Sequence, residues 1–212
     1  LKKGADFYPH FLEYTRDCCQ YIRSQKIDFT KIKWDVSKKI EILFFDGPKD
    51  KDLLCQCLTI FNESLLPGKT ILVFQDYQHP ISYDLAIALE SLEGKLELLH
   101  SIEAGGTVSF LLKDVINIQV DLLEKEISSS QMILLWESLI SRHTGMVKNR
   151  MKAAYALYLC MTGNVEHAKT VLNEVAFDRR LHAGWQNWQD ISRLNKIYGP
   201  IFDHYNKTII KH

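Results

Sequence analysis

The chain has 212 residues, 26 Lys and Arg against 26 Asp and Glu, a formal net charge of zero and 46% hydrophobic residues. This size allows one domain with an appendage or two small domains around a buried core. The neutral charge, without a long Lys/Arg cluster, argues against nucleic acid or anionic lipid as a partner. No apolar stretch approaches the roughly 20 residues that cross a bilayer, and no signal-peptide pattern is present. We therefore expect a cytoplasmic protein.

The five cysteines are odd in number, and their spacings are not those of a secreted disulfide framework. We expect reduced thiols. Cys55 and Cys57 form a Cys-x-Cys pair that could bind a metal, but core packing is the more common role in an apolar segment such as LLCQCLTIF. The chain begins at Leu1, and we expect it to be an excerpt of something longer.

The N-terminal part predicts a helix and two strands. Residues 7–23 carry apolar and aromatic side chains at helical spacing and predict an amphipathic helix. Residues 26–34 alternate apolar and polar side chains, as a half-buried strand does. Residues 40–45 predict a strand, and the unbroken apolar run at 42–45 is typical of a short central strand covered on both faces.

The next elements alternate between helix and strand. A polar turn leads into a helix predicted at 52–64, which ends at the sequence LLPGK. Residues 70–74 (TILVF) predict a second buried strand. After it, a helix is expected to begin at Ser82, a natural N-cap, and to run to about Leu92.

Two further strands close the first part of the chain. Residues 95–102 and 107–112 predict a hairpin with Ala104-Gly105-Gly106 as its turn. The order of elements predicts the α/β class, with a parallel layer closed by an antiparallel edge. We place a domain boundary near residue 115, because residues 116–212 show helical periodicity and no strand pattern.

The helical part contains one repeat-like segment. Residues 153–174 have the spacing of a tetratricopeptide unit, so we expect a helical hairpin near 150–175. A lone unit cannot bury its own face, and an ordinary helical hairpin packed on the first domain is the alternative. Trp185 and Trp188 lie three positions apart and could cap the domain or form a dimer contact.

Each of the two buried strands is followed by an acid. Asp46 follows the first strand, and Asp76 follows the second, within Gln75-Asp76-Tyr77. Ligands of open parallel α/β sheets bind beyond the carboxyl ends of the strands. If the strands are neighbours, the two carboxylates lie side by side and can hold a hard divalent cation. The alternative is that both acids begin turns and cap the helices that follow.

The stretch IEILFFDG…LLPGKTILVFQDY resembles the latter half of class I S-adenosylmethionine-dependent methyltransferases. It is most similar to the group of macrocin-type sugar O-methyltransferases and cephalosporin hydroxylase-like proteins. There the fourth strand ends in Asp-Gly, a Leu-x-Pro-Gly-Gly turn introduces the fifth, and that strand ends in an acidic cluster. The hairpin 95–112 corresponds to the reversed last strand that marks the methyltransferase sheet. The resemblance covers residues 7–114 and implies a Rossmann-like sheet that is incomplete at its N-terminus.

The resemblance also implies a reaction and its residues. It implies methyl transfer from S-adenosylmethionine to a hydroxyl of a sugar or other small polar acceptor. Asp46 and Asp76, with Gln75 in the place of a further acid, would bind a magnesium ion that holds and polarises the acceptor hydroxyls. Asp46 and His79 would be catalytic, with His79 as general base; a histidine of a surface turn is the alternative.

The cofactor side of the resemblance is weaker. Asp35, in KWDVS, falls where the family places a residue near the cofactor adenine, and Trp34 could stack on that ring; a plain strand-end acid is the alternative. The family's glycine-rich loop is absent, because Gly4 is the last glycine before Gly47. Either the first strands lie outside this sequence or the domain has lost cofactor binding.

Two other hypotheses stay open beside the methyltransferase. One is a non-catalytic methyltransferase-like scaffold whose C-terminal helices bind a protein partner or a second copy of the chain. The missing glycine loop and the repeat-like hairpin favour it. The other is a glycosyltransferase-like domain with a metal and a nucleotide-sugar diphosphate at Asp46, but no Asp-x-Asp follows the strand.

Overall fold

The computed structural model describes residues 6–47, 49–79, 83–92, 94–103, 106–179, 181–183, 185 and 192–208. Three features predicted from the sequence lie outside these residues: the N-cap Ser82, the hairpin turn at Ala104 and Gly105, and Trp188. The chain divides into two compact units, Leu1–Trp34 and Asp35–His212. The change of composition near residue 115 falls within the second unit, where the sheet ends.

The first unit contains helix α1 (Tyr8–Tyr14) and the 3-10 turns Arg16–Cys18 and Phe29–Lys31. The helix predicted at 7–23 is therefore shorter than expected. The strand predicted at 26–34 is wrong. The side chain of Asp28 accepts a hydrogen bond from the backbone N–H of Thr30 at 3.0 Å and begins a 3-10 turn, so local capping overrides the alternating pattern.

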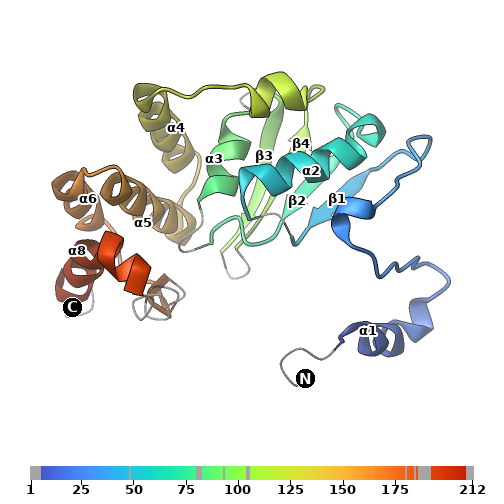
Figure 1. Cartoon of the computed structure of the whole chain (residues 1–212), viewed down its shortest axis with the longest axis horizontal. Coiled ribbons are helices and arrows are strands. Elements are labelled where there is room, and N and C mark those ends of the chain that lie inside the picture. Colours follow the sequence, from blue (N-terminus) through green and yellow to red (C-terminus); the bar gives the residue numbers. More distant parts are fainter. Residues whose placement is uncertain are drawn as a thin grey trace. The chain divides into compact units, whose positions relative to one another are not determined.

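The second unit contains four strands: β1 (Ile42–Phe45), β2 (Ile71–Phe74), β3 (Leu96–Ile102) and β4 (Thr107–Leu112). Their order in the sheet is β1-β2-β4-β3 (Figure 1). β1 and β2 are parallel, and β4 runs antiparallel to both of its neighbours. The expected mixed α/β architecture is confirmed, and the reversed strand lies inside the sheet.

The helices of this unit are α2 (Lys51–Phe61), α3 (Asp84–Glu90), α4 (Ser129–Ser141), α5 (Gly145–Met161), α6 (Val165–Leu172) and α8 (Ser192–Thr208). A 3-10 turn (Asn62–Ser64) follows α2, and a π-helical turn (Gln119–Leu123) follows the sheet. The helix predicted at 52–64 is confirmed to within a few residues, and the described elements after residue 116 are helical, as the periodicity predicts. α5 and α6 pack side by side as the hairpin expected near 150–175 (Figure 1).

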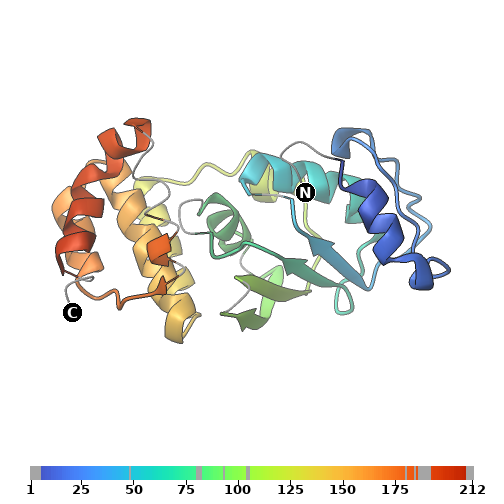
Figure 2. The ribbon, with the colours of Figure 1, turned by 90° about the horizontal axis from the view of Figure 1, so that it is seen from below.

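The core lies between one face of the sheet and helices α2 and α3, which cover that face together (Figure 2). Phe74 is fully buried at its centre. Its ring stacks on that of Phe45 with centroids 4.9 Å apart and meets the ring of Phe110 edge-on at 6.3 Å. The three rings join β1, β2 and β4 through side chains as well as through backbone hydrogen bonds.

The prediction that residues 40–45 form a strand covered on both faces is wrong. In the described part of the sheet β1 pairs with β2 alone. Ile42 and Phe44 are 65% and 55% exposed, whereas Phe45 is buried. Burial alternates along the strand as it does in any half-covered sheet. The continuous apolar run hid this alternation, because apolar residues stand on the exposed face too.

Two phenylalanines on neighbouring strands test this arrangement. Replacing the buried Phe74 by Ala is expected to lower the free energy of unfolding by about 3–5 kcal/mol, since it leaves a cavity in the core. Phe44→Ala, on the exposed face, should cost about 1 kcal/mol or less. Urea unfolding of both variants measures the difference, and equal losses would contradict the one-sided core.

Candidate functional site

Asp46 and Asp76 lie at the same edge of the sheet, and the carboxylates of both lie near the ammonium group of Lys49. β1 and β2 are paired in parallel up to their last residues, Phe45 and Phe74, so the chain leaves both strands at the same edge. The ammonium group of Lys49 contacts the carboxylate of Asp76 and lies 4.0 Å from that of Asp46. We call Asp46, Lys49 and Asp76 the acid edge.

The turn after β2 places Asp76 in an unusual conformation. Its φ is 58°, in the left-handed region that side chains other than glycine enter at a cost of about 1–2 kcal/mol. The turn is pinned on both sides: the backbone N–H of Gln75 donates to the last carbonyl of β1 at 2.9 Å, and that of His79 donates to the carbonyl of Asp76 at 3.0 Å. Gln75 and His79 therefore flank Asp76 in this turn, while their predicted roles as metal ligand and general base stay predictions.

The same turn is anchored from the helical part of the unit. Tyr77 and Gln78 are both buried. The hydroxyl of Tyr77 lies 3.3 Å from Nε2 of His143, and Oε1 of Gln78 accepts a hydrogen bond from Nη1 of Arg150 at 2.8 Å. Nε of Arg150 donates to the carboxylate of Asp178 at 2.5 Å, and both side chains are nearly inaccessible. A buried ion pair therefore supports the turn that carries Asp76.

Sequence reasoning missed this support. The available signal was a single arginine in the apolar run NRMKAAYALYL of α5, because a charged side chain among core residues needs a partner. No pattern in the sequence indicated which acid or which loop would provide that partner.

His143 is a neutral link within this support. Burial, and after it the nearby charge of Arg142, lowers the pKa of His143 to about 4. Its ring lies between the hydroxyl of Tyr77 and that of Ser101, each 3.3 Å from a ring nitrogen. A neutral imidazole serves these neighbours as one donor and one acceptor, so His143 acts here as a structural hydrogen-bonding group.

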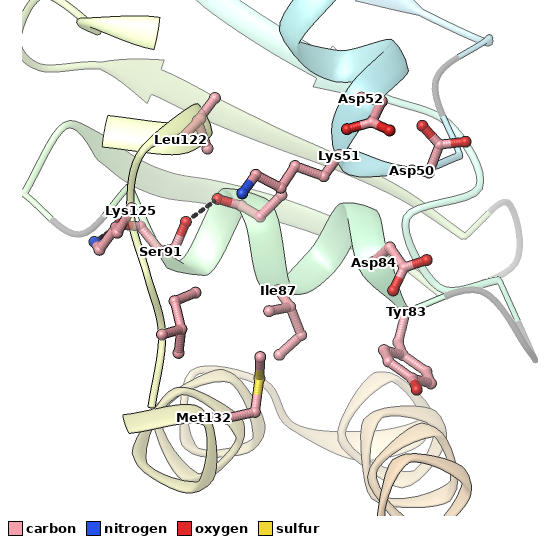
Figure 3. A pocket seen from close by; sticks show the side chains of 12 residues that line it. Asp50, Lys51, Asp52, Tyr83, Asp84, Ile87, Ser91, Leu122, Lys125 and Met132 are labelled. Carbon is pink, nitrogen blue, oxygen red and sulfur yellow. Dashed lines mark hydrogen bonds between the residues drawn. The ribbon is translucent and has the colours of Figure 1, made fainter. Parts of the chain in front are cut away.

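A cavity of about 400 Å³ is lined by residues of α2, α3 and α4 and of the segment before α4 (Figure 3). Its lining consists of acids at the starts of α2 and α3, of apolar side chains, and of Lys125. The lining residues include Asp50, Asp52, Asp84, Ile87, Leu122, Lys125 and Met132. Burial, and next the charge of Asp50, raises the pKa of Asp84. Asp50, at the acidic end of the cavity, directly follows Lys49 of the acid edge in the sequence.

Of the two residues predicted to contact the cofactor adenine, Asp35 does not join the acid edge, and the role of Trp34, in the first unit, stays a prediction. The carboxylate of Asp35 accepts hydrogen bonds from the hydroxyl of Ser37 at 2.7 Å and from its backbone N–H at 3.1 Å, which lower its pKa. The next carbonyl, that of Val36, accepts a hydrogen bond from Ser64, ahead of the amino end of β2. Asp35 thus lies at the opposite end of the strands from Asp46, while Trp34 is the last residue of the first unit.

The residues of the acid edge do not fit a resident magnesium ion as they stand. Magnesium needs oxygen ligands in octahedral array, whereas the ammonium of Lys49 carries protons and no lone pair. In the described ranges no group of three or more His, Cys, Asp or Glu side chains is placed to hold a metal ion. The predicted magnesium ion therefore stays a prediction, and we derive no step through it.

The cysteine pair has no such role either. Cys55 and Cys57 are buried in α2, and burial raises the pKa of the Cys57 thiol to about 12. A thiol that keeps its proton is a poor metal ligand. The core-packing interpretation of this pair is therefore the one that the structure supports.

Comparisons with protein-family models, with curated proteins and with solved structures found no match. Among the helices that the structure describes, none is long and apolar enough to cross a membrane. The function must therefore be argued from the chemistry of the acid edge and of the cavity.

The buried ion pair can be tested against an exposed pair on the same helix. Arg150→Met removes the cation beside the buried carboxylate of Asp178 and is expected to cost about 3–5 kcal/mol of unfolding free energy. Lys152→Met removes the partner of the exposed Glu174 and should cost less than about 1 kcal/mol. Denaturant titrations compare the two, and similar small losses would show that Arg150 does not support the turn.

His143 makes stability depend on pH. Because its pKa falls to about 4 in the folded chain from a usual 6.5, the unfolded chain binds more protons between these values. Stability should therefore rise with pH across this window and decline by about 1–3 kcal/mol as the pH falls through it. Thermal unfolding from pH 7 to pH 4 measures the effect. His143→Gln should remove most of this dependence of stability on pH. His100→Gln, at an exposed position, should leave the dependence as it is in the wild type.

Proposed function

We propose that this protein is an S-adenosylmethionine-dependent O-methyltransferase that acts on a hydroxyl of a sugar or another small polar acceptor. The observation that carries the proposal is the parallel pair β1 and β2, which delivers Asp46 and Asp76 to one point at the carboxyl edge of the sheet. Loops at this edge form the ligand sites of open α/β sheets.

The arrangement of the sheet supports the same proposal. The reversed strand β4 lies next to β2, as expected for the strand that marks a methyltransferase sheet. The Pro-Gly turn that the resemblance places before the fifth strand precedes β2. Gly68 has φ 75° there, and its N–H donates to the carbonyl of Leu112 at 2.7 Å, so this turn joins β2 to β4. We infer a Rossmann-like sheet in which β1 and β2 take the places of the family's fourth and fifth strands.

The cavity suits a polar acceptor. Its volume of about 400 Å³ is in the range of small-molecule sites, and one end carries the carboxylates of Asp50, Asp52 and Asp84. Carboxylates accept hydrogen bonds from hydroxyl groups, and a sugar offers several of these on one small framework. The apolar side chains of Ile87 and Leu122 provide a surface for the less polar face of the ring.

The acid edge suits the proton transfer that O-methylation needs. S-adenosylmethionine, when bound, supplies an electrophilic methyl carbon. The acceptor oxygen must lose its proton as it attacks, and a carboxylate or imidazole at the edge can take that proton. Asp46, whose side chain is 60% exposed, is the first candidate for this base, and His79 in the neighbouring turn is the second. We derive nothing on the cofactor side, because Asp35 lies away from this edge.

Methyl transfer can be tested on the full-length protein. S-adenosylhomocysteine should bind with micromolar affinity in calorimetry, and labelled S-adenosylmethionine should methylate members of a panel of sugars. Asp46→Asn removes the proposed base and is expected to lower kcat by about 100-fold or more without changing cofactor affinity. Asp203→Asn, an exposed acid on α8, is the matched control and should keep full activity.

The cavity has a separate test in the same assay. Asp84→Asn removes one acceptor of hydrogen bonds from the cavity and should raise KM for the sugar about 10-fold with little change in kcat. If the full-length protein binds no S-adenosylhomocysteine, the methyltransferase proposal fails, and a non-catalytic module with protein-binding helices becomes the better hypothesis.

A further inference from the structure

We infer that Lys49 supplies the positive charge of the acid edge, in the place where the resemblance implies a divalent cation. This inference rests on the proposed function. The ammonium group contacts the carboxylate of Asp76 and lies 4.0 Å from that of Asp46, so the two acids share one cation that belongs to the chain itself. A divalent cation could bind the same two carboxylates only after this ammonium had left.

The position of Lys49 is fixed from both directions along the chain. It lies three residues after Asp46 and one residue before Asp50, the N-cap of α2. The side chain of Asp50 accepts a hydrogen bond from the backbone N–H of Leu53 at 2.8 Å, which fixes the start of the helix. The capped helix start and the paired strand thus hold the backbone of Lys49 near the edge, within reach of both acids.

The other partner is also held in place. Asp76 occupies a left-handed turn whose next two residues, Tyr77 and Gln78, are buried against the helical part of the unit. This anchoring keeps the carboxylate of Asp76 at the level of Asp46 instead of letting it turn into solvent. The lysine therefore lies between two acids whose backbones are fixed independently, β1 holding one and the anchored turn the other.

The charge of Lys49 gives it a role in the proposed reaction. An ammonium group can donate a hydrogen bond to the acceptor oxygen and stabilise the negative charge that develops when its proton leaves. A carboxylate of the edge would take the hydroxyl proton; S-adenosylmethionine, when bound, would supply the methyl carbon to which the oxygen bonds, and its sulfur would keep the electron pair of the broken bond. Lys49 remains protonated throughout, so it does for the oxygen what a metal ion would do.

Binding of Mn²⁺, followed by electron paramagnetic resonance on the full-length protein, tests this inference without a methyl acceptor. Wild-type protein should bind no stoichiometric Mn²⁺ at about 1 mM metal. Lys49→Ala and Lys49→Gln remove a positive charge that lies within about 4 Å of both acids and should bind one equivalent about 10-fold tighter or more. Lys49→Arg keeps the charge and should behave as the wild type. Lys69→Ala, an exposed lysine before β2, is the control for net charge.

A second substitution locates the metal. Adding Asp76→Asn to Lys49→Ala should abolish the gained affinity if Mn²⁺ replaces the ammonium at the acid edge. Equal Mn²⁺ affinity in wild type and Lys49→Ala, whether weak or tight, would overturn the inference. These results do not depend on S-adenosylhomocysteine binding. Failure of the methyltransferase proposal would therefore appear as absent cofactor binding with the Mn²⁺ result unchanged.

Discussion

The parallel register of β1 and β2 is the constraint on which the rest of the site depends. Phe45 lies beside Phe74, and their stacked rings, 4.9 Å apart, fix the strands at their last residues from within the core. A slip of β1 by one residue would turn the ring of Phe45 to the exposed face, while Phe74 stayed in the core, and would shift Asp46 relative to Asp76. The core packing and the geometry of the acid edge are therefore consequences of the same pairing, and neither can change alone.

The helical region contributes to this edge as a second support. Arg150 of α5 reaches the turn through Gln78, and the ring of Trp136 of α4 meets that of Tyr83, next to the first turn of α3, at 5.2 Å. The helices that follow the sheet in the sequence thus support two segments. One is the turn after β2, which contributes to the acid edge, and the other is the start of α3, which lines the cavity. Their role is more than that of an appendage, because the buried ion pair with Asp178 links the stability of the helices to the position of Asp76.

The part of this structure that the sequence predicts is the part set by short-range patterns. Two apolar runs that each end on an acid predicted β1 and β2. They also predicted that Asp46 and Asp76 lie close together, because consecutive parallel strands are often neighbours. The role of Lys49 was not predictable, since a loop lysine can extend in many directions and the choice depends on the turn that holds Asp76. The role of Arg150 was not predicted for a related reason. A buried ion pair between segments that are far apart in the sequence leaves no periodic pattern of residues.

The charges around the edge also bear on the choice among acceptors. The acid edge carries two carboxylates and one ammonium, and one end of the cavity adds Asp50, Asp52 and Asp84. Lys51 and Lys125 offset part of this charge, but the acids at the cavity mouth outnumber them. A diphosphate would bring further negative charge to this surface, so electrostatics disfavour the nucleotide-sugar that a glycosyltransferase-like domain requires. A neutral sugar meets no such repulsion and can donate its hydroxyl protons to the same carboxylates, which makes the acidity of the site an argument for a neutral, hydroxyl-rich acceptor.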